Sequence, residues 1–265
     1  MLQTDYMDDS NKNFKIETNY NSIHLVYHQG RLELRSQDKS LQSVVNLDKP
    51  HQLELRNLEY LMSVLLFVAA PQRILMLGTA AGSLLHFLRY HYPQADITAV
   101  DIDNELIERL LELDILPPAD DRLTYICDDA QQFIKRSGQS FDLLLVDVFN
   151  GAQSPSWLLE TASIQQLHDL ISNHGALAFN LLVDSDHDFR LFTRAVRQQF
   201  QQQTLCLPVG GLENRIVFGV RSRSVARDMT ANMQTALDLS EQLEIDFMPI
   251  LSVIYNTNPV GEGLI

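Results

Sequence analysis

Residues 73–82 read RILMLGTAAG, and residues 99–103 read AVDID. The apolar run 74–77 in the first stretch is typical of a parallel strand that is buried on both faces. Gly78 ends this run, and the leucines after it recur at helical spacing. The turn that begins with Gly78 therefore lies where the carboxyl end of a strand meets the amino end of a helix. Its residues are small, so that a ligand can approach the backbone closely.

The second half of the pattern is Asp101, which ends an apolar run and stands 23 positions after Gly78. A carboxylate at roughly that distance, ~20 residues, usually accepts hydrogen bonds from ribose hydroxyls. The dinucleotide pattern G-x-G-x-x-G is absent, because Ala80 replaces its second glycine and Ser83 follows Gly82. The turn therefore favours S-adenosylmethionine or a relative, which has no phosphate, over NAD or FAD. The alternative is that Gly78 only makes a turn and Asp101 only caps a helix.

The composition is that of an acidic globular protein. The chain has 265 residues, 45% of them hydrophobic, and a formal net charge of −14. This charge would repel nucleic acid, although it could attract a cationic polyamine. The longest apolar candidate, 61–70, is about half of the ~20 residues of a membrane span, and residues 1–13 lack the apolar region of a secretory signal. The two cysteines match neither a metal motif nor a disulfide framework. We expect a cytoplasmic protein with no metal, nucleic acid or membrane partner.

The order of predicted elements indicates an α/β protein in three parts. Residues 1–52 form a disordered start, 1–13, and a small β-rich appendage; residues 53–222 form a nucleoside-binding Rossmann-like domain; residues 223–265 form a helix and a tail. Strands and helices alternate in the middle part, as in a doubly wound, mostly parallel sheet. Its seventh strand follows a glycine-containing turn, which predicts an antiparallel hairpin strand, as in class I methyltransferase-like folds. The predicted strands are 23–27, 31–34 and 41–45 in the appendage, and 74–77, 97–100, 123–126, 142–147, 176–182, 204–209 and 215–220 in the sheet. The predicted helices are 58–70, 83–92, 104–113, 129–136, 161–173, 187–201 and 224–244.

Acidic residues follow the predicted strands at the edge where such sheets bind ligands. Asp101 and Asp103 follow the second strand, Asp128 and Asp129 the third, and Asp147 the fourth. Capping of the next helix is an adequate explanation for Asp103 and Asp128. Asp147 is the strongest functional candidate, because an apolar run precedes it and a loop that could close over a ligand follows it. A carboxylate there can orient an attacking amine or accept its proton.

The sequence resembles the spermidine synthase (polyamine aminopropyltransferase) family, especially its bacterial spermidine-synthase-like branch, over roughly residues 22–221. The resemblance implies S-adenosylmethionine or its decarboxylated form as cofactor, a small-molecule amine as acceptor, and a homodimer. The long fourth-strand motif is the most specific, whereas the glycine turn would serve any class I methyltransferase. The shared motifs are LQS at 41–43, RILMLGTAAGS at 73–83, AVDID at 99–103, DDAQQF at 128–133, DLLLVDVFNGAQSPSWLLETASIQQL at 142–167 and HGALAFNLL at 174–182.

The resemblance also implies roles for single residues. Asp147 would be the catalytic acidic residue at the reacting amine, and Asn150 would bind the substrate. Gln42 would help to close the cofactor site, unless it is a plain strand residue. Asp129 would meet the adenine amino group, unless it only caps a helix. The residues that the resemblance implies for cofactor binding are Gln42, Gly78, Thr79, Ala81, Gly82, Asp101, Asp129 and Ala130.

Two departures from the family pattern remove charge. Synthases have the turn G-G-G-D/E-G-G, whose acidic residue binds the aminopropyl ammonium of decarboxylated S-adenosylmethionine, and here Ala81 stands at that position. Synthases also carry D-x-x-D-P after the fourth strand; here Asp147 is kept, while Asn150 and Gly151 replace the others. A lost charge-assisted contact typically weakens binding by ~1.5–3 kcal/mol.

We therefore expect a spermidine-synthase-like transferase for which classical spermidine synthesis is doubtful. It would pass an aminopropyl or a methyl group to an amine-type acceptor and release methylthioadenosine or S-adenosylhomocysteine. The alternatives are a non-catalytic homologue that binds a nucleoside or a partner, and an NAD-dependent dehydrogenase.

Overall fold

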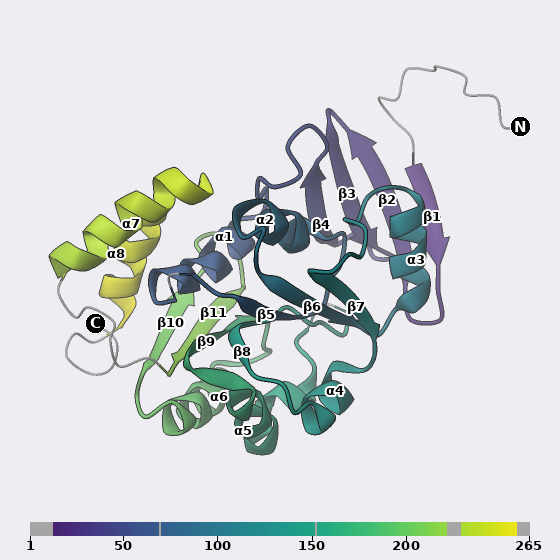
Figure 1. Ribbon diagram of the computed structural model, residues 1–265. Helices are drawn as coiled ribbons and strands as arrows, with labels where there is room; N and C mark the ends of the chain where they lie inside the picture. The colour runs from purple at the N-terminus through teal and green to yellow at the C-terminus, as the bar shows by residue number, and fades with distance from the viewer. Residues whose placement is uncertain (1–12, 69, 152, 222–228, 259–265) are drawn as a thin grey trace, which may run out of the picture.

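The computed structural model describes residues 13–68, 70–151, 153–221 and 229–258, which form a large sheet covered by helices and a smaller sheet beside it (Figure 1). The smaller sheet is antiparallel, in the strand order β1-β2-β3-β4. Its strands are β1 (Asn13–Glu17), β2 (Ser22–His28), β3 (Arg31–Ser36) and β4 (Leu41–Asn46). The predicted β-rich appendage is thus confirmed.

The large sheet has seven strands in the order β10-β11-β9-β8-β5-β6-β7. Strands β5 to β9 run parallel to their neighbours among themselves, whereas β11 pairs antiparallel with both β9 and β10. The sequence predicts this fold class, including the antiparallel hairpin strand. The strands are β5 (Arg73–Leu77), β6 (Asp96–Asp101), β7 (Leu123–Cys127), β8 (Phe141–Val146), β9 (Ile171–Leu181), β10 (Thr204–Pro208) and β11 (Arg215–Val220).

Helices cover both faces of the large sheet. They are α1 (Arg56–Met62), η1 (Ser63–Leu66), α2 (Ser83–His91), α3 (Asn104–Glu112), α4 (Ala130–Arg136), η2 (Ser156–Leu159), α5 (Thr161–Asp169), α6 (Asp186–Gln199), α7 (Met229–Leu243) and α8 (Phe247–Thr257). Figure 1 shows α4, α5 and α6 on one face and α1, α2 and α3 on the other. Helix α8 packs against β10, and α7 packs against α8. None of the described helices has the length and apolar character needed to cross a membrane.

The buried apolar side chains form two cores, one on each face of the large sheet, and successive side chains of β5 belong to them in turn. In β5, Ile74 and Met76 belong to the core that α1, α2 and α3 share with the small sheet. Leu75 and Leu77 belong to the core under α4, α5 and α6. Because successive side chains of a strand point to opposite faces, β5 is apolar on both. The chain is therefore held firmly on both sides up to Gly78, where the predicted site begins.

Polar contacts join the small sheet to the large one. Thr18 and Asn21, in the turn after β1, donate to the buried Asp103 carboxylate over 2.6 and 2.8 Å. The same carboxylate caps α3, as predicted. On β4, the hydroxyl of Ser43 lies 2.9 Å from the hydroxyl of Ser83 at the start of α2. These hydrogen bonds therefore attach the small sheet to the amino ends of α2 and α3, the helices that follow β5 and β6.

The first strand differs from the prediction. The expected disordered start, 1–13, lies outside the described residues except for Asn13, which begins β1. The sequence of β1, NFKIE, is mostly polar, and Ile16 is its one buried residue. Its pairing with β2 decides its conformation, and a search for apolar runs misses such an edge strand.

Two helices follow the large sheet where the sequence predicts one helix and a tail. The predicted helix 224–244 is observed as α7, and its residues 224–228 lie outside the described part of the chain. Helix α8 is a correction to the predicted tail. Its signal is present in the sequence, because Asp246 caps it and Ile250 and Ile254 are buried at helical spacing.

Two other helices are shorter than predicted. The predicted helix 161–173 ends at Asp169, because β9 already begins at Ile171. The predicted helix 58–70 is observed as α1, which continues as the 3-10 helix η1 up to Leu66.

Candidate functional site

The turn after β5 is a tight cradle built on two glycines. Gly78 and Gly82 both have a left-handed backbone, with φ of 88° and 80°, which other residues rarely adopt. A Cβ atom at Gly78 would lie 2.3 Å from the Asp147 carbonyl oxygen, and one at Gly82 would lie 2.4 Å from Leu116 Cδ2. Both positions therefore require glycine, and the turn brings the ends of β5 and β8 into contact.

Asp101, at the end of β6, faces the same turn. Its Oδ2 accepts hydrogen bonds of 2.8 Å from both the amide and the hydroxyl of Thr79, and its Oδ1 accepts one of 3.0 Å from the Asp103 amide. A carboxylate has about four acceptor sites, so Oδ1 keeps a site for a ligand hydroxyl. Asp101 thus shapes the turn, and Thr79, which is 3% exposed, is directed toward Asp101.

Ala81 lies inside the protein. Its side chain is 0% exposed and belongs to the core that includes α2. A loop that carries Leu116 covers the turn, and His86 and Tyr125 hold this loop through hydrogen bonds of 2.7 Å to its backbone carbonyls. Apolar groups therefore surround the position at which the family pattern has an acidic residue.

Gln42 is half-buried on β4, close to the start of α2. Its Nε2 makes a long contact of 3.5 Å with the Ser36 hydroxyl of β3. The next residue, Ser43, bonds to Ser83, which also donates to the Val44 carbonyl at 2.8 Å. These bonds fix β4 beside the helix that follows the glycine turn. The role of Gln42 in closing the cofactor site stays a prediction.

Asp129 is the N-cap of α4. Its Oδ1 accepts a hydrogen bond of 2.9 Å from the Gln132 amide. Asp129 therefore caps the helix, and no described residue bonds to its second oxygen. Its contact with the adenine amino group stays a prediction. Ala130 begins α4 and is partly buried against the core under this helix. The preceding Asp128 forms an ion pair of 2.5 Å with Arg136.

Asp147 follows β8 at the middle of the edge. Its amide donates to the Leu77 carbonyl at 2.9 Å, and its Oδ1 accepts a hydrogen bond of 2.8 Å from Asn180 Nδ2. Burial raises the pKa of this carboxyl group to about 6, while the hydrogen bond from Asn180 acts in the opposite direction. A carboxyl group with this pKa can exchange a proton near neutral pH, which is the property that a general base needs.

Asn180 is a residue of the site that the sequence reasoning misses. It lies near the end of β9, is 1% exposed, and accepts a hydrogen bond of 2.8 Å from Asn214 Nδ2. Asn214 belongs to the turn between β10 and β11. A signal for Asn180 exists, because an amide within the apolar run ALAFNLL must find a partner when it is buried. Nothing local identifies that partner, since 34 residues separate Asn180 from Asn214.

Asn150 lies in an exposed tight turn after Asp147. Its amide donates to the Gln153 carbonyl at 2.8 Å. Gly151 follows with a φ of 64°, and nothing lies within 4 Å of the position that a Cβ atom would take there. The predicted role of Asn150 in substrate binding stays a prediction.

Backbone hydrogen bonds continue past the strand ends and hold the site residues in one row. Asp147 donates to the end of β5, Gly78 donates to the Val100 carbonyl at 2.8 Å, and Asp128 donates to the Asp101 carbonyl at 3.0 Å. The order β8-β5-β6-β7 thus sets Asp147, the glycine turn, Asp101 and the start of α4 side by side. Within the described ranges, no group of three or more His, Cys, Asp or Glu side chains could hold a metal ion.

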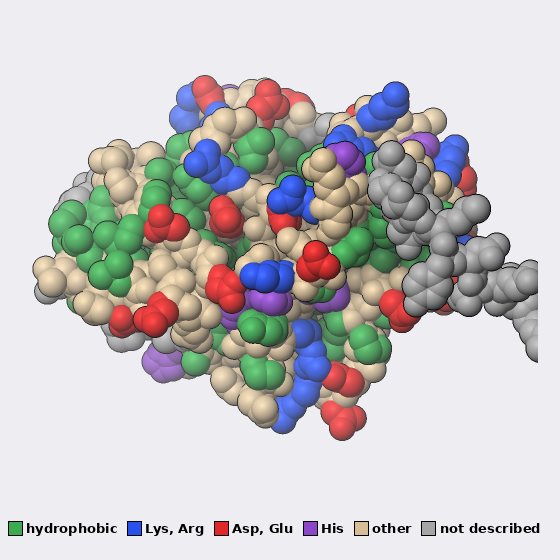
Figure 2. Space-filling model, turned by 90° about the horizontal axis from the view of Figure 1, so that it is seen from above, with side chains coloured by type: hydrophobic (Ala, Val, Ile, Leu, Met, Phe, Trp, Pro, Cys, Tyr) green, Lys and Arg blue, Asp and Glu red, His purple; other side chains and the backbone are tan. Residues whose placement is uncertain are grey.

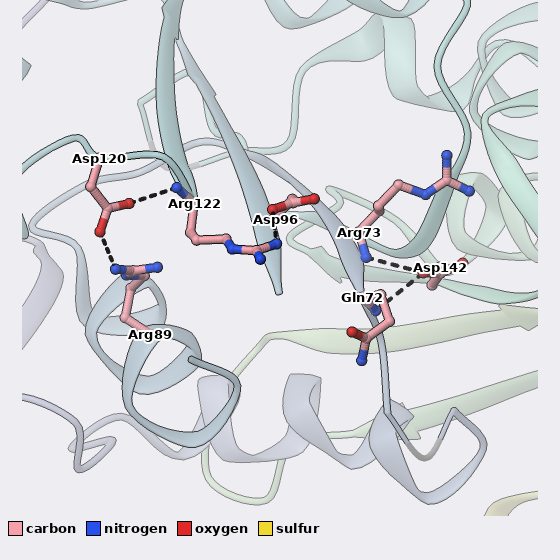
Figure 3. A network of polar contacts seen from close by, with 7 residues as sticks. All are labelled: Gln72, Arg73, Arg89, Asp96, Asp120, Arg122 and Asp142. Atoms are coloured by element: carbon pink, nitrogen blue, oxygen red, sulfur yellow. Dashed lines mark hydrogen bonds and ion pairs between the residues drawn. The ribbon is translucent and has the colours of Figure 1, made fainter. Parts of the chain in front are cut away.

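The opposite edge of the sheet also carries aspartates, but they are paired (Figure 3). The contacts there join acidic side chains to arginines or to backbone amides at the amino ends of β5 to β8. They are Asp96 with Arg122 at 2.6 Å, Asp120 with Arg89 and with the Arg122 amide at 2.8 Å, and Asp142 with the Gln72 and Arg73 amides at 3.1 and 3.0 Å. By contrast, the described residues provide no ion pair for Asp101, Asp129 or Asp147.

Comparison with known proteins identifies relatives of this fold and site. The family model for the spermine/spermidine synthase domain matches residues 54–180. A polyamine aminopropyltransferase from Neisseria meningitidis is 28% identical over 221 residues, which are 83% of this chain and 84% of that protein.

Solved structures share the architecture. A probable spermidine synthase from Corynebacterium glutamicum superposes with a TM-score of 0.75 at 21% identity, covering 87% of this chain and 88% of that one. Human methyltransferase-like protein 13, in complex with SAH, superposes with a TM-score of 0.60 at 20% identity, covering 74% and 92%.

The sheet order, the glycine turn and these relatives define the class of protein, which is a transferase of the S-adenosylmethionine type with a methyltransferase-like fold. Within this class, the chain is similar to the spermidine synthase family, whose domain model matches residues 54–180. The resemblance found in the sequence motifs is thereby confirmed.

Proposed function

We propose that this protein transfers an alkyl group, aminopropyl or methyl, from decarboxylated or intact S-adenosylmethionine to a small-molecule amine. One observation carries the proposal: the carboxylates of Asp101, Asp129 and Asp147 line the carboxyl edge of the sheet around a glycine turn, and no cation of the described residues pairs with them. Hydrogen-bond donors of a nucleoside and an amine are the partners that such carboxylates lack.

The turn and the edge fit an adenosine nucleoside. Gly78 and Gly82 keep the backbone of the turn free of side chains, and Asp101 has an acceptor site left on Oδ1 for a ribose hydroxyl. Asp129 and Ala130 would meet the adenine. When bound, this nucleoside supplies a carbon attached to a positively charged sulfur, which becomes a neutral thioether once the acceptor nitrogen has taken that carbon.

Asp147 acts on the acceptor in this proposal. Its carboxylate orients the amine and accepts the proton that the nitrogen loses as it forms the new bond. Burial supports this role, because the raised pKa of about 6 brings proton acceptance close to neutral pH. The net charge of −14 also favours the approach of a cationic amine.

Two observations bear on which group is transferred. The Neisseria relative, named a polyamine aminopropyltransferase, supports the aminopropyl group. The neutral, fully buried Ala81 supports methyl transfer as the second candidate, because no carboxylate stands there to bind the ammonium of an aminopropyl chain. The human neighbour that binds SAH is consistent with this candidate.

A homodimer is a further part of the proposal, and the exposed face of α7 supports it. Met229, Met233 and Leu237 are exposed at a spacing of four residues, which places them on one side of the helix. Figure 2 shows hydrophobic side chains gathered at the end of the molecule where α7 and α8 lie. Light scattering of the protein and of Met233→Glu tests this: a dimeric mass for the first and a monomeric mass for the second is the expected result.

The activity is tested by incubating the protein with each form of S-adenosylmethionine and a panel of diamines and polyamines, and by following methylthioadenosine and S-adenosylhomocysteine by chromatography. Amine-dependent release of one thioether product supports the proposal and identifies the group. Release of neither product, from protein that binds the nucleoside, would favour a non-catalytic homologue.

A further inference from the structure

Two amide hydrogen bonds in series reach Asp147 from the antiparallel end of the sheet. Asn214 Nδ2 donates to Asn180 Oδ1 at 2.8 Å, and Asn180 Nδ2 donates to Asp147 Oδ1 at 2.8 Å. Asn180 is almost fully buried on β9, and Asn214 is half-buried in the turn before β11. The three residues therefore form one line of contacts from a turn near the surface to the centre of the site.

The chemistry of the groups determines the direction of this line. An ionised carboxylate only accepts hydrogen bonds, so Asn180 must turn its NH2 group toward Asp147. The carbonyl oxygen of Asn180 then faces Asn214, which must donate. Asn214 thus supports this orientation, because it donates to the carbonyl oxygen that Asn180 turns away from Asp147.

We propose that Asn180 and Asn214 are positioning residues, which hold Oδ1 of Asp147 and leave Oδ2 as the oxygen that meets the acceptor amine. No described residue bonds to Oδ2. This inference rests on the proposed function of Asp147 and deepens it, because it names the reacting atom and a remote residue that controls it. A turn between β10 and β11 would then decide how well the carboxylate is oriented.

The charged groups near Asp147 do not explain its pKa, so the hydrogen bond from Asn180 is the specific contact that acts on it. Asp101 lies at the end of β6, and Arg215, next to Asn214, is paired with Asp186 at 2.5 Å. From β5 and β9, no charged side chain of the described residues faces Asp147. Besides its buried surroundings, the hydrogen bond from Asn180 is what acts on the pKa of Asp147.

The variant Asn214→Asp reverses the donor and acceptor directions along the line of contacts, with a side chain of the same size and shape. A carboxylate at position 214 only accepts, so Asn180 must turn its NH2 group toward it and its carbonyl oxygen toward Asp147. Asp147 then loses its donor and faces an oxygen. Loss of a hydrogen bond to a charged group corresponds to a rise of about one to two pH units in the pKa of Asp147.

The control variant is Leu212→Asp, which adds the same charge to the same turn. Leu212 is exposed, and its side chain takes no part in the hydrogen bonds of Asn180. A general effect of negative charge would therefore act similarly in both variants, whereas an effect through the amide acts in Asn214→Asp alone. The background Asn180→Ala provides a second control, because it removes the link itself.

The measurement is the titration of the Asp147 carboxyl carbon by 13C NMR, assigned by its loss in Asp147→Asn, together with the pH profile of turnover. We expect a rise of about one to two pH units in Asn214→Asp, a rise several times smaller in Leu212→Asp, and no further rise from Asn214→Asp in the Asn180→Ala background. Equal rises in the first two variants, or no rise in Asn214→Asp, overturn the inference.

The two readouts separate this inference from the proposed function. If the carboxyl titration and the acid limb of the pH profile move together, both are supported. If the titration moves while the pH profile of turnover does not, the line of contacts stands and the role of Asp147 as proton acceptor is overturned.

Discussion

Both edges of the large sheet carry aspartates, but Asp96 and Asp120 at the amino edge pair with arginines, whereas Asp101 and Asp147 at the carboxyl edge meet no cation of the described residues. Two aspartates depart from this contrast, because Asp142 at the amino edge meets backbone amides and Asp128 at the carboxyl edge pairs with Arg136. At the amino edge, aspartates meet arginines or backbone amides, as Asp96 meets Arg122 (Figure 3). At the carboxyl edge, the described residues offer Asp101 and Asp147 only uncharged partners. A charge that is neutralised within the fold belongs to its architecture, whereas a carboxylate without a cation can take a partner from a ligand. The difference distinguishes Asp101 and Asp147 from the ion-paired aspartates Asp96, Asp120 and Asp128.

Exchanging Asp147 for asparagine should give the largest effect. Without a proton acceptor we expect turnover to fall by roughly 100- to 10,000-fold, while nucleoside binding, measured by calorimetry, changes little. The matched control is Asp142→Asn at the start of the same strand, whose carboxylate bonds to the Gln72 and Arg73 amides. This control should lower stability by about 1 kcal/mol and leave turnover intact; equal losses of turnover in both variants would contradict the comparison.

The glycine turn is probed by Gly78→Ala. The new Cβ would lie 2.3 Å from the Asp147 carbonyl oxygen, in a backbone with φ of 88°, so we expect unfolding free energy to fall by about 2–5 kcal/mol and nucleoside binding to weaken. Gly138→Ala is the control, because nothing lies within 4 Å of its Cβ position. Denaturant titration of both variants should show a loss for Gly78→Ala alone; a fully stable Gly78→Ala protein would mean that the cradle is not rigid.

Strand β6 carries one aspartate of each kind at its two ends. Replacing Asp101 by asparagine removes the charge at the glycine turn, and we expect nucleoside affinity to fall by about 10- to 150-fold, equivalent to ~1.5–3 kcal/mol. Asp96→Asn breaks an exposed ion pair at the other end of the strand, which is worth about 0.2–1 kcal/mol of stability. Calorimetric titration of both variants with S-adenosylhomocysteine checks this, and similar affinities would remove Asp101 from the cofactor site.

The carboxyl group of Asp147, which is partly buried, should also make the free energy of unfolding depend on pH. Its pKa is raised from 3.8 in the unfolded chain to about 6 in the fold, so the native state binds this proton more tightly. The contribution of this bound proton to the free energy of unfolding is fully present below about pH 4 and is lost as pH rises through about 6. Asp147→Asn should therefore be about 1–3 kcal/mol more stable than the parent protein at pH 8, with the difference shrinking toward pH 4. Denaturation curves of both proteins at pH 8 and pH 4 measure this difference. A difference in unfolding free energy that is the same at the two pH values would contradict the raised pKa.

Much of the carboxyl edge follows from local sequence patterns. The end of an apolar strand run predicts where Gly78, Asp101 and Asp147 lie, because parallel strands place their carboxyl ends at one edge. Helix capping by Asp103 is predictable for the same reason, since the cap and its helix are adjacent in the chain.

The contacts between distant elements are not predictable in this way. The bond from Asn214 to Asn180 depends on the pairing of β11 with β9, and the burial of Ala81 depends on a loop held by His86 and Tyr125. Their cause is tertiary packing, which no local spacing records. Helix α8 is different, because its cap at Asp246 and its apolar spacing are local and visible in the sequence.

The most direct test of the account is calorimetric titration of the purified protein with S-adenosylmethionine and, separately, with its decarboxylated form. We predict that one nucleoside binds per chain in at least one titration and that Asp101→Asn weakens this binding. The preferred form then identifies the transferred group, aminopropyl for the decarboxylated form and methyl for the intact one. Binding of neither form would contradict the assignment of the carboxyl edge as a cofactor site.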